Sequence, residues 1–194
     1  KERFAGADDF TFVFVGSFTP EQIKPFVETY IASLPAKGVK EEYKDLNLDY
    51  PKGPVTTTIN KGVDQKAQVD FYWKKDAKYD DKTAFDFSVF NRILMMRLIN
   101  SLREEMGGTY SPGAGGMATY VPRDQVTFRI AFGSSMEMYD ALQKRALEEL
   151  AKILADGPTA KEVADQKAQN EVQWAENTEK NNFWLSNLSQ AAKI

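Results

Sequence analysis

Apolar side chains recur at helical spacing in the first quarter of the chain and again in its middle. The first series begins after Thr19, which is suited to N-capping, and continues up to Pro35, so a helix is expected between them. The second series predicts a long helix over 81–106, and Gly107 follows it as a C-terminal cap. Its apolar stripe consists of Phe87, Phe90, Leu94, Leu98 and Leu102.

Further helices are predicted toward the C-terminus. The pattern over 136–154 is helical, and the turn-forming residues 156–158 stop it. Thr159 and Glu162 then have the spacing of a capping box, in which each side chain accepts a hydrogen bond from the backbone of the other residue. The last helical region is therefore expected to begin at this pair.

Runs rich in β-branched and aromatic residues predict the strands. Phe10–Gly16 reads as a buried strand that ends at a glycine. The runs 55–60 and 67–73 are expected to pair antiparallel with each other, with one face covered. The runs 110–120 and 125–133 predict a second strand pair.

The order of these elements favours an α+β fold. A doubly wound parallel sheet would need a helix after nearly every strand, which this order does not provide. An antiparallel or mixed sheet with helices packed on one face fits better. The polar stretch 36–54, with several Pro and Gly residues, is expected to be a surface connection. Residues 1–194 suit one domain, and the charged start and the end without a helix stop favour a fragment of a larger multi-domain chain.

The sequence contains neither cysteine nor histidine. The two absences exclude disulfides, thiolate zinc sites and the Ser-His-Asp and Cys-His nucleophile arrangements. They also exclude the H-x-x-E-H zinc motif, which needs two histidines. The net charge of −3, with Lys and Arg scattered along the chain, gives no electrostatic reason to expect a nucleic-acid partner.

No apolar run approaches the roughly 20 residues needed to cross a bilayer, so no membrane span is predicted. Residues 1–9 lack the order of charged, apolar and small positions that a signal peptide shows. The compartment is left open between the cytoplasm and, with an export signal upstream of this chain, the bacterial periplasm or cell envelope.

Arg103 and Tyr110 are the candidate site residues, because they place a fixed cation and a phenol around the end of the predicted helix 81–106. The guanidinium offers a rigid fork of donors, and the hydroxyl is a neutral donor at pH 7. Taken singly, each residue has an ordinary structural explanation. Arg103 suits the helix dipole or a neighbouring acid, Glu104 or Glu105, and Tyr110 suits the amphipathic edge of a core.

The segment 101–111, Ser-Leu-Arg-Glu-Glu-Met-Gly-Gly-Thr-Tyr-Ser, resembles the R-E-x-x-G-x-x-Y signature in the non-catalytic domain of pitrilysin/insulinase-type zinc metallopeptidases. Other segments resemble landmarks of that family in the same order and together span most of the chain: 12–21, 33–35, 97–104 and 181–188. The chain departs from the family pattern at two places. Bulky residues fill 94–98 where small ones often precede the Arg-Leu pair, and Gly108 stands where a larger apolar residue is common.

The resemblance implies the α/β roll of that family and a chain that is inactive by itself. In the family, the residues that match Arg103 and Tyr110 reach the zinc site of a partner domain, so both are expected to be catalytic residues supplied in trans. Zinc would be held by that partner, with no metal or cofactor site in this chain. The expected partners are a catalytic domain, in the same polypeptide or in another subunit, and a peptide substrate that is enclosed.

Two alternatives stay open for the function. One is a structural domain of the same fold with no role in catalysis. The other is a peptide-binding module in which an exposed sheet edge pairs with the main chain of a peptide.

Two further features have simpler structural explanations. Gly113–Gly116 lacks the Lys-Ser/Thr ending of a phosphate loop and is expected to form a close-packed or twisted start of a strand. The carboxylates Asp86, Glu104 and Glu105 are expected to be helix-surface charges rather than metal ligands, because no third ligand has a matching spacing.

Overall fold

The computed structural model describes residues 6–38, 44–46 and 48–192. Parts of the charged start and of the predicted connection 36–54, and the last two residues of the chain, lie outside this range. The described residues divide into two compact units. Residues 44–167 form the larger unit, and residues 6–38 and 168–192 belong to the smaller one.

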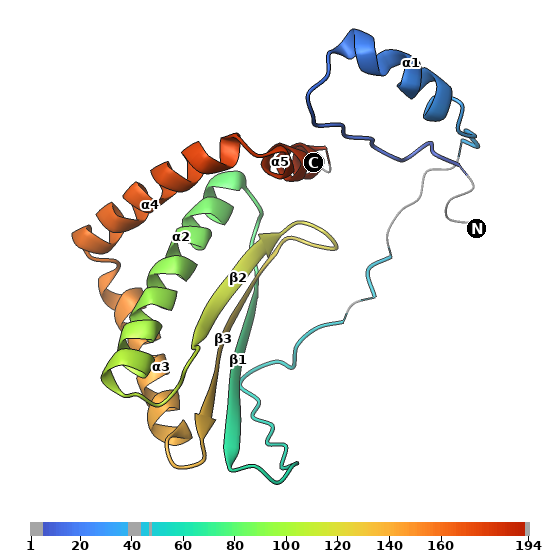
Figure 1. Ribbon diagram of the computed structural model, residues 1–194. Coiled ribbons are helices and arrows are strands. Elements are labelled where there is room, and N and C mark those ends of the chain that lie inside the picture. The colour runs from blue at the N-terminus through green and yellow to red at the C-terminus, as the bar shows by residue number, and fades with distance from the viewer. Residues whose placement is uncertain (1–5, 39–43, 47, 193–194) are drawn as a thin grey trace. The chain divides into compact units, whose positions relative to one another are not determined.

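An antiparallel sheet forms the centre of the larger unit, and in the described chain it has three strands in the order β1-β3-β2. The helices α2 and α3 lie on one face of this sheet (Figure 1). The bounds are β1 Lys66–Asp76, β2 Gly113–Thr119, β3 Gln125–Ser135, α2 Asp81–Leu98 and α3 Tyr139–Asp156. This arrangement confirms the predicted α+β class, with an antiparallel sheet and helices packed on one face.

The core lies between the sheet and these two helices, and it confirms the predicted apolar stripe. Leu94, Leu98 and Leu102 are completely buried, and Phe87 and Phe90 pack against them. Their partners from the sheet and from α3 are Ile130, Phe132 and Leu142, also buried. Burying side chains of this size contributes about 1.5–3 kcal/mol each, so this stripe fixes the position of the helix that ends beside Arg103.

The predicted helix ends are confirmed where local capping determines them. In α1 (Pro20–Tyr30), the Thr19 hydroxyl accepts from the Gln22 amide at 3.3 Å, and the Gln22 side chain accepts from the Thr19 amide at 2.8 Å. The helix ends at Tyr30, earlier than the predicted end before Pro35. The C-terminal helices are α4 (Ala160–Thr178) and α5 (Asn181–Ala191).

The structure corrects the strand predictions in the first third of the chain. Neither Phe10–Gly16 nor 55–60 forms a strand in the described chain, and β1 pairs with β3 rather than with 55–60. Strand propensity becomes a strand only where a neighbouring backbone supplies a ladder, and the described structure provides none for these runs. Phe10, Phe12 and Phe14 are 40–45% exposed. The prediction that the run Phe10–Gly16 is buried is therefore wrong.

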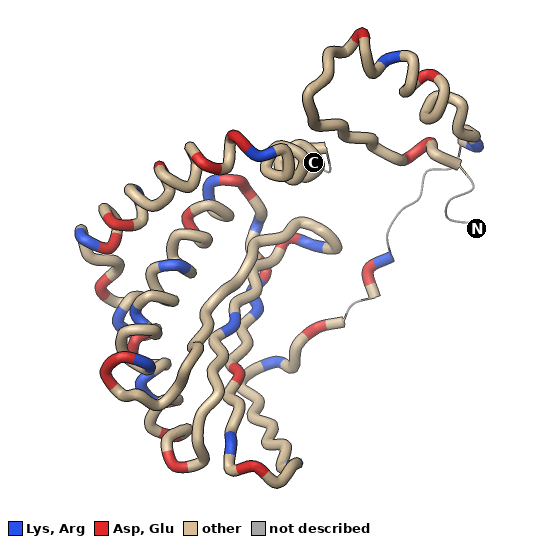
Figure 2. Tube along the Cα trace, viewed as in Figure 1, with Lys and Arg blue, Asp and Glu red and all other residues tan. Residues whose placement is uncertain are grey.

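Charged side chains of both signs are interspersed along the chain, as Figure 2 shows for its Lys, Arg, Asp and Glu positions. Within the described residues, no helix combines the length and the apolar character that crossing a membrane requires.

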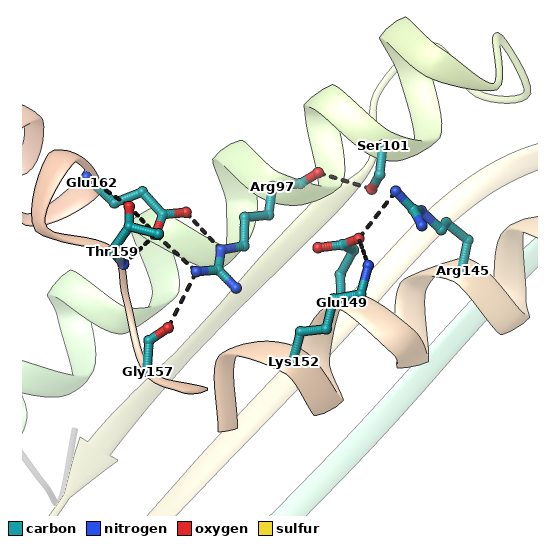
Figure 3. A network of polar contacts seen from close by, with 8 residues as sticks. All are labelled: Arg97, Ser101, Arg145, Glu149, Lys152, Gly157, Thr159 and Glu162. Carbon is teal, nitrogen blue, oxygen red and sulfur yellow. Dashed lines mark hydrogen bonds and ion pairs between the residues drawn. The ribbon is translucent and has the colours of Figure 1, made fainter. Parts of the chain in front are cut away.

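A bidentate ion pair fastens the start of α4 to α2 (Figure 3). The Nε of Arg97 donates to Glu162 Oε1 at 2.6 Å, and its Nη2 donates to Glu162 Oε2 at 2.8 Å and to the Gly157 carbonyl at 3.2 Å. Glu162 also accepts from the Thr159 amide at 2.7 Å and its own amide donates to the Thr159 hydroxyl, which confirms the predicted capping box. Hydrogen bonding to the Arg97 guanidinium lowers the pKa of Glu162 from 4.5 to about 2.

Because of the Arg97–Glu162 ion pair, we expect the free energy of unfolding to decrease in acid. Because the pKa of Glu162 is lower in the folded chain, its contribution is complete above pH 4.5 and is lost as the pH falls from 4.5 toward 2. We expect Glu162→Gln to lower the free energy of unfolding by about 2–3 kcal/mol at pH 6. The difference from wild type should fall to about 1 kcal/mol at pH 2.5, where Glu162 is still partly ionised, and vanish only below pH 2. Urea unfolding of both proteins across this range tests it, and a difference that does not change with pH would contradict it.

Candidate functional site

Arg103 lies in a wide helical turn that continues α2 without a break. The segment Ile99–Glu105, labelled η2, is a π-helix, a local irregularity that often occurs at functional sites. At its start the Ser101 hydroxyl donates to the Arg97 carbonyl at 2.8 Å, which occupies an acceptor that an α-helical amide would use. Since Leu102 is completely buried, Arg103 projects outward from a fixed backbone.

The loop after the helix is held in a defined shape. Gly107 has a φ of +62°, as expected for a glycine cap, and its amide donates to the Arg103 carbonyl at 3.0 Å. The Gly108 amide donates to the Leu102 carbonyl at 3.2 Å. Thr109 and Pro112 are buried, so the loop is anchored on both sides of Tyr110.

Arg103 and Tyr110 are brought together at the surface. The guanidinium carbon of Arg103 lies 5.2 Å from the centre of the Tyr110 ring, within the range of a cation–π contact. Tyr110 is 83% exposed, and the Arg103 side chain is 47% exposed. Tyr110 precedes β2, which begins at Gly113, so it lies in the loop rather than at the start of the strand as predicted. The anchored loop thus presents an exposed ring whose hydroxyl is accessible to a ligand.

The structural explanation for Arg103, an ion pair with a neighbouring acid, leaves most of its hydrogen-bond donors unexplained. Its Nε lies 3.4 Å from Glu104 Oε1, which is an exposed contact of small energetic value. Within the described residues, neither the Arg103 guanidinium nor the Tyr110 hydroxyl makes a hydrogen bond. The pair therefore presents donors that a carbonyl or an oxyanion could accept.

The carboxylates near the helix are engaged with cations. Asp86 pairs with Lys82, and Glu105 accepts from Arg145 Nη2 at 3.0 Å. Among the residues that the structure describes, no three acidic side chains are grouped so that they could hold a metal ion. These residues accordingly do not fit a zinc ion by themselves.

Gly116 confirms that the glycine-rich run is a close-packed strand. It lies in β2, and a Cβ built on it would stand 2.2 Å from the Thr127 carbonyl oxygen and 2.9 Å from the Phe87 ring. Its own carbonyl accepts from the Asn91 side chain at 3.0 Å. The absence of a side chain is thus what allows β2 to lie between β3 and α2.

A hollow of about 360 Å³ lies elsewhere on the larger unit. Its lining includes Lys74 and Arg123, whose charges are matched by carboxylates of the segment 44–50. The Arg123 nitrogens lie 2.9 Å from Asp45 and from Asp49. Because these cations are already paired, the hollow presents a weaker case for ligand binding than the Arg103–Tyr110 pair.

Sequence reasoning missed the residues of α3 that support the loop. Arg145 reaches Glu105, and the Leu142 side chain fills the space beside Gly108, where a Cβ would come within 2.8 Å of it. This packing explains why residue 108 is a glycine, although a larger apolar residue is common there in the family that the segment 101–111 resembles. In the sequence, Arg145 and Leu142 show only helical spacing on α3, and this spacing does not reveal which loop they contact.

Comparison with known proteins gives a consistent family and fold. The family model for the peptidase M16 inactive domain matches residues 1–170. Among solved structures, the periplasmic protease PqqL from Escherichia coli aligns with 91% of this chain at 18% identity and a TM-score of 0.74. A predicted insulinase family protease from Yersinia pestis aligns with 92% of it at 16% identity and a TM-score of 0.63.

A further solved structure, a mutant of the ferredoxin protease FusC in complex with Arabidopsis ferredoxin, aligns with 84% of this chain at 21% identity and a TM-score of 0.65. At these identities the likeness shows the fold alone. The aligned part covers 19% of the PqqL chain, 40% of the Yersinia chain and 18% of the FusC chain. A search of curated proteins gives no significant match.

Proposed function

Because the chain belongs to the family of inactive M16 peptidase domains, we propose that it is the non-catalytic half of a zinc endopeptidase. In this proposal the domain helps to enclose a peptide substrate and supplies Arg103 and Tyr110 to a zinc site on a partner domain. The partner is a catalytic domain of the same polypeptide or of another subunit, and the two together are called the intact protein below. The chain alone is expected to be inactive.

The observation that carries the proposal is the exposed Arg103–Tyr110 pair. Arg103 at the end of η2 and Tyr110 on the anchored loop after it form a set of neighbouring donors, and preorganised donors stabilise developing negative charge. The rigid fork of Arg103 suits a substrate carbonyl. The Tyr110 hydroxyl suits the oxygen that becomes negative when the peptide bond is attacked.

Zinc chemistry must come from the partner, because this sequence has no histidine or cysteine and its described acids form no ligand group. A zinc ion would supply an activated water and polarise the scissile carbonyl. The residues of this chain bind and orient the peptide and donate hydrogen bonds to its oxygens. The active site is then complete only when both domains meet around the substrate.

The alternative of a peptide-binding domain without a catalytic role has one supporting observation. In the described sheet, β1 and β2 each have one side without a neighbouring strand, and a peptide could pair with such an edge. That function would not depend on Arg103 or Tyr110, so the same experiment separates the two proposals.

The test is hydrolysis of a quenched peptide by the intact protein, with zinc content measured for each variant. We expect Arg103→Ala to lower kcat/KM about 10- to 100-fold at unchanged zinc content, the effect of removing a charged hydrogen-bond donor. Arg103→Lys should restore little, because an ammonium lacks the planar fork.

Arg129→Ala is the matched control. Arg129 also lies over a tyrosine ring, with its guanidinium carbon 5.3 Å from the centre of Tyr72, and it has an exposed ion pair with Asp70. Its side chain is 51% exposed, close to the value for Arg103. We expect this variant to keep wild-type activity. Equal activity of both alanine variants and wild type would favour the structural or peptide-binding alternative.

A further inference from the structure

Arg145 of α3 connects the end of η2 to the body of the domain. Its Nη2 lies 3.0 Å from Glu105 Oε2 and 3.2 Å from Glu149 Oε1, and its Nη1 lies 4.0 Å from Glu148. Figure 3 shows the contact with Glu149, whose side chain is almost completely buried. Glu105 is two residues from Arg103, so this ion pair acts directly on the turn that carries the candidate site.

Glu149 does not need Arg145 for its own neutralisation. Lys152, one turn further along α3, lies 3.1 Å from the same Glu149 oxygen. Within the described chain, Glu105 has Arg145 as its cation partner. Removing Arg145 therefore leaves the buried carboxylate paired and releases the end of η2.

Leu142 gives the loop a second attachment from the same side of α3. Leu142 and Arg145 are three residues apart, which places them on one face of the helix. The completely buried Leu142 packs against Gly108, whereas Arg145 holds Glu105. The two contacts thus hold the backbone between Arg103 and Tyr110 at two points, Glu105 and Gly108.

We infer that Arg145 is a positioning residue that, with Leu142, fixes the turn between Arg103 and Tyr110 so that both side chains face the same ligand. This role rests on the proposed function for its effect on catalysis. Its effect on the loop itself can be measured independently. A displacement of about 1 Å in a substrate-contacting group is enough to lower the rate substantially, so a salt bridge outside the site can affect turnover.

The experiment compares Arg145→Met with wild type in the intact protein by hydrogen–deuterium exchange and by steady-state hydrolysis of a quenched peptide. The reporters are the Gly107 and Gly108 amides, which donate to the Arg103 and Leu102 carbonyls. We expect about tenfold faster exchange in 106–111, with unchanged exchange in α2. We also expect kcat to fall about tenfold with little change in KM.

Three variants separate positioning from general stability. Lys152→Met removes a partner of the same Glu149 without touching Glu105, and it should leave both exchange and kcat unchanged. Glu105→Met should reproduce the effect of Arg145→Met, whereas Glu105→Gln retains an acceptor for Arg145 and should keep most of the wild-type behaviour.

Each outcome decides the inference. Faster exchange confined to 106–111 supports positioning, and if kcat is then unchanged, the catalytic role proposed for Arg103 and Tyr110 fails while positioning stands. Unchanged exchange in 106–111 overturns the inference whatever happens to kcat. Faster exchange throughout the domain overturns it as well, because Arg145 would then contribute only to overall stability.

Discussion

Replacing Tyr110 with Phe is expected to lower the kcat of the intact protein about 100-fold while its zinc content stays the same. The substitution removes only the hydroxyl group. The ring that lies 5.2 Å from the Arg103 guanidinium remains, so the cation–π contact and the position of Arg103 are kept. The loss therefore reports the hydrogen bond that the hydroxyl would donate as negative charge develops on the substrate. Steady-state hydrolysis of a quenched peptide and metal analysis measure the two quantities.

Tyr72→Phe is the matched control for this substitution. Tyr72 is also exposed, at 55%, and also lies beneath an arginine, but it is on the sheet rather than in the loop after η2. Its replacement should leave kcat and KM at their wild-type values. If Tyr110→Phe and Tyr72→Phe both retain full activity, Tyr110 has no part in the reaction, and a structural function for the loop becomes the better explanation.

The helices could be predicted because their determinants are local. Thr19 and Thr159 start helices through side chains only three residues away, and Gly107 ends one through its own backbone conformation. The apolar stripe of α2 was equally visible, since it needs only one covering surface. What could not be predicted was the change to a π-helix over 99–105, in which the Ser101 hydroxyl donates to the Arg97 carbonyl.

The strands were harder to predict, because pairing is a property of two segments. The sequence predicts strands over 67–73 and 125–133 but not their pairing, although β1 and β3 pair along their whole length. The run 55–60 has similar composition and is not a strand in the described chain. β-propensity describes a side chain that suits a half-buried sheet, and it does not specify which backbone is adjacent.

The candidate site likewise contains residues that the sequence indicates and residues that only the structure reveals. Spacing and the resemblance of their segment to a known signature indicate Arg103 and Tyr110 as candidates, and the structure brings their side chains together. Arg145 and Leu142 could not be identified, because Arg145 contacts a residue 40 positions earlier in the sequence and Leu142 packs against the distant Gly108. Residues within one segment can form a motif, whereas residues that contact this segment from another helix depend on the tertiary structure.

The sheet beside the site provides the second large expected effect. Gly116→Ala should lower the free energy of unfolding by about 3 kcal/mol or more. The added methyl group would lie 2.2 Å from the Thr127 carbonyl oxygen, a backbone atom that cannot move without opening the β2–β3 ladder. It would also press on the ring of Phe87, a residue of α2 that packs against the buried core. Urea unfolding of the variant and of wild type measures the difference.

Gly115→Ala gives the comparison that makes this result specific. Gly115 is the preceding residue of the same strand, and a Cβ there meets no atom within 4 Å because it points to the opposite face of the sheet. The two substitutions change helix and strand propensity equally, so the difference between them isolates the collision. Gly115→Ala should stay within about 0.5 kcal/mol of wild type. Equal unfolding midpoints for both variants would contradict the close approach of Gly116 to the Thr127 carbonyl and the Phe87 ring.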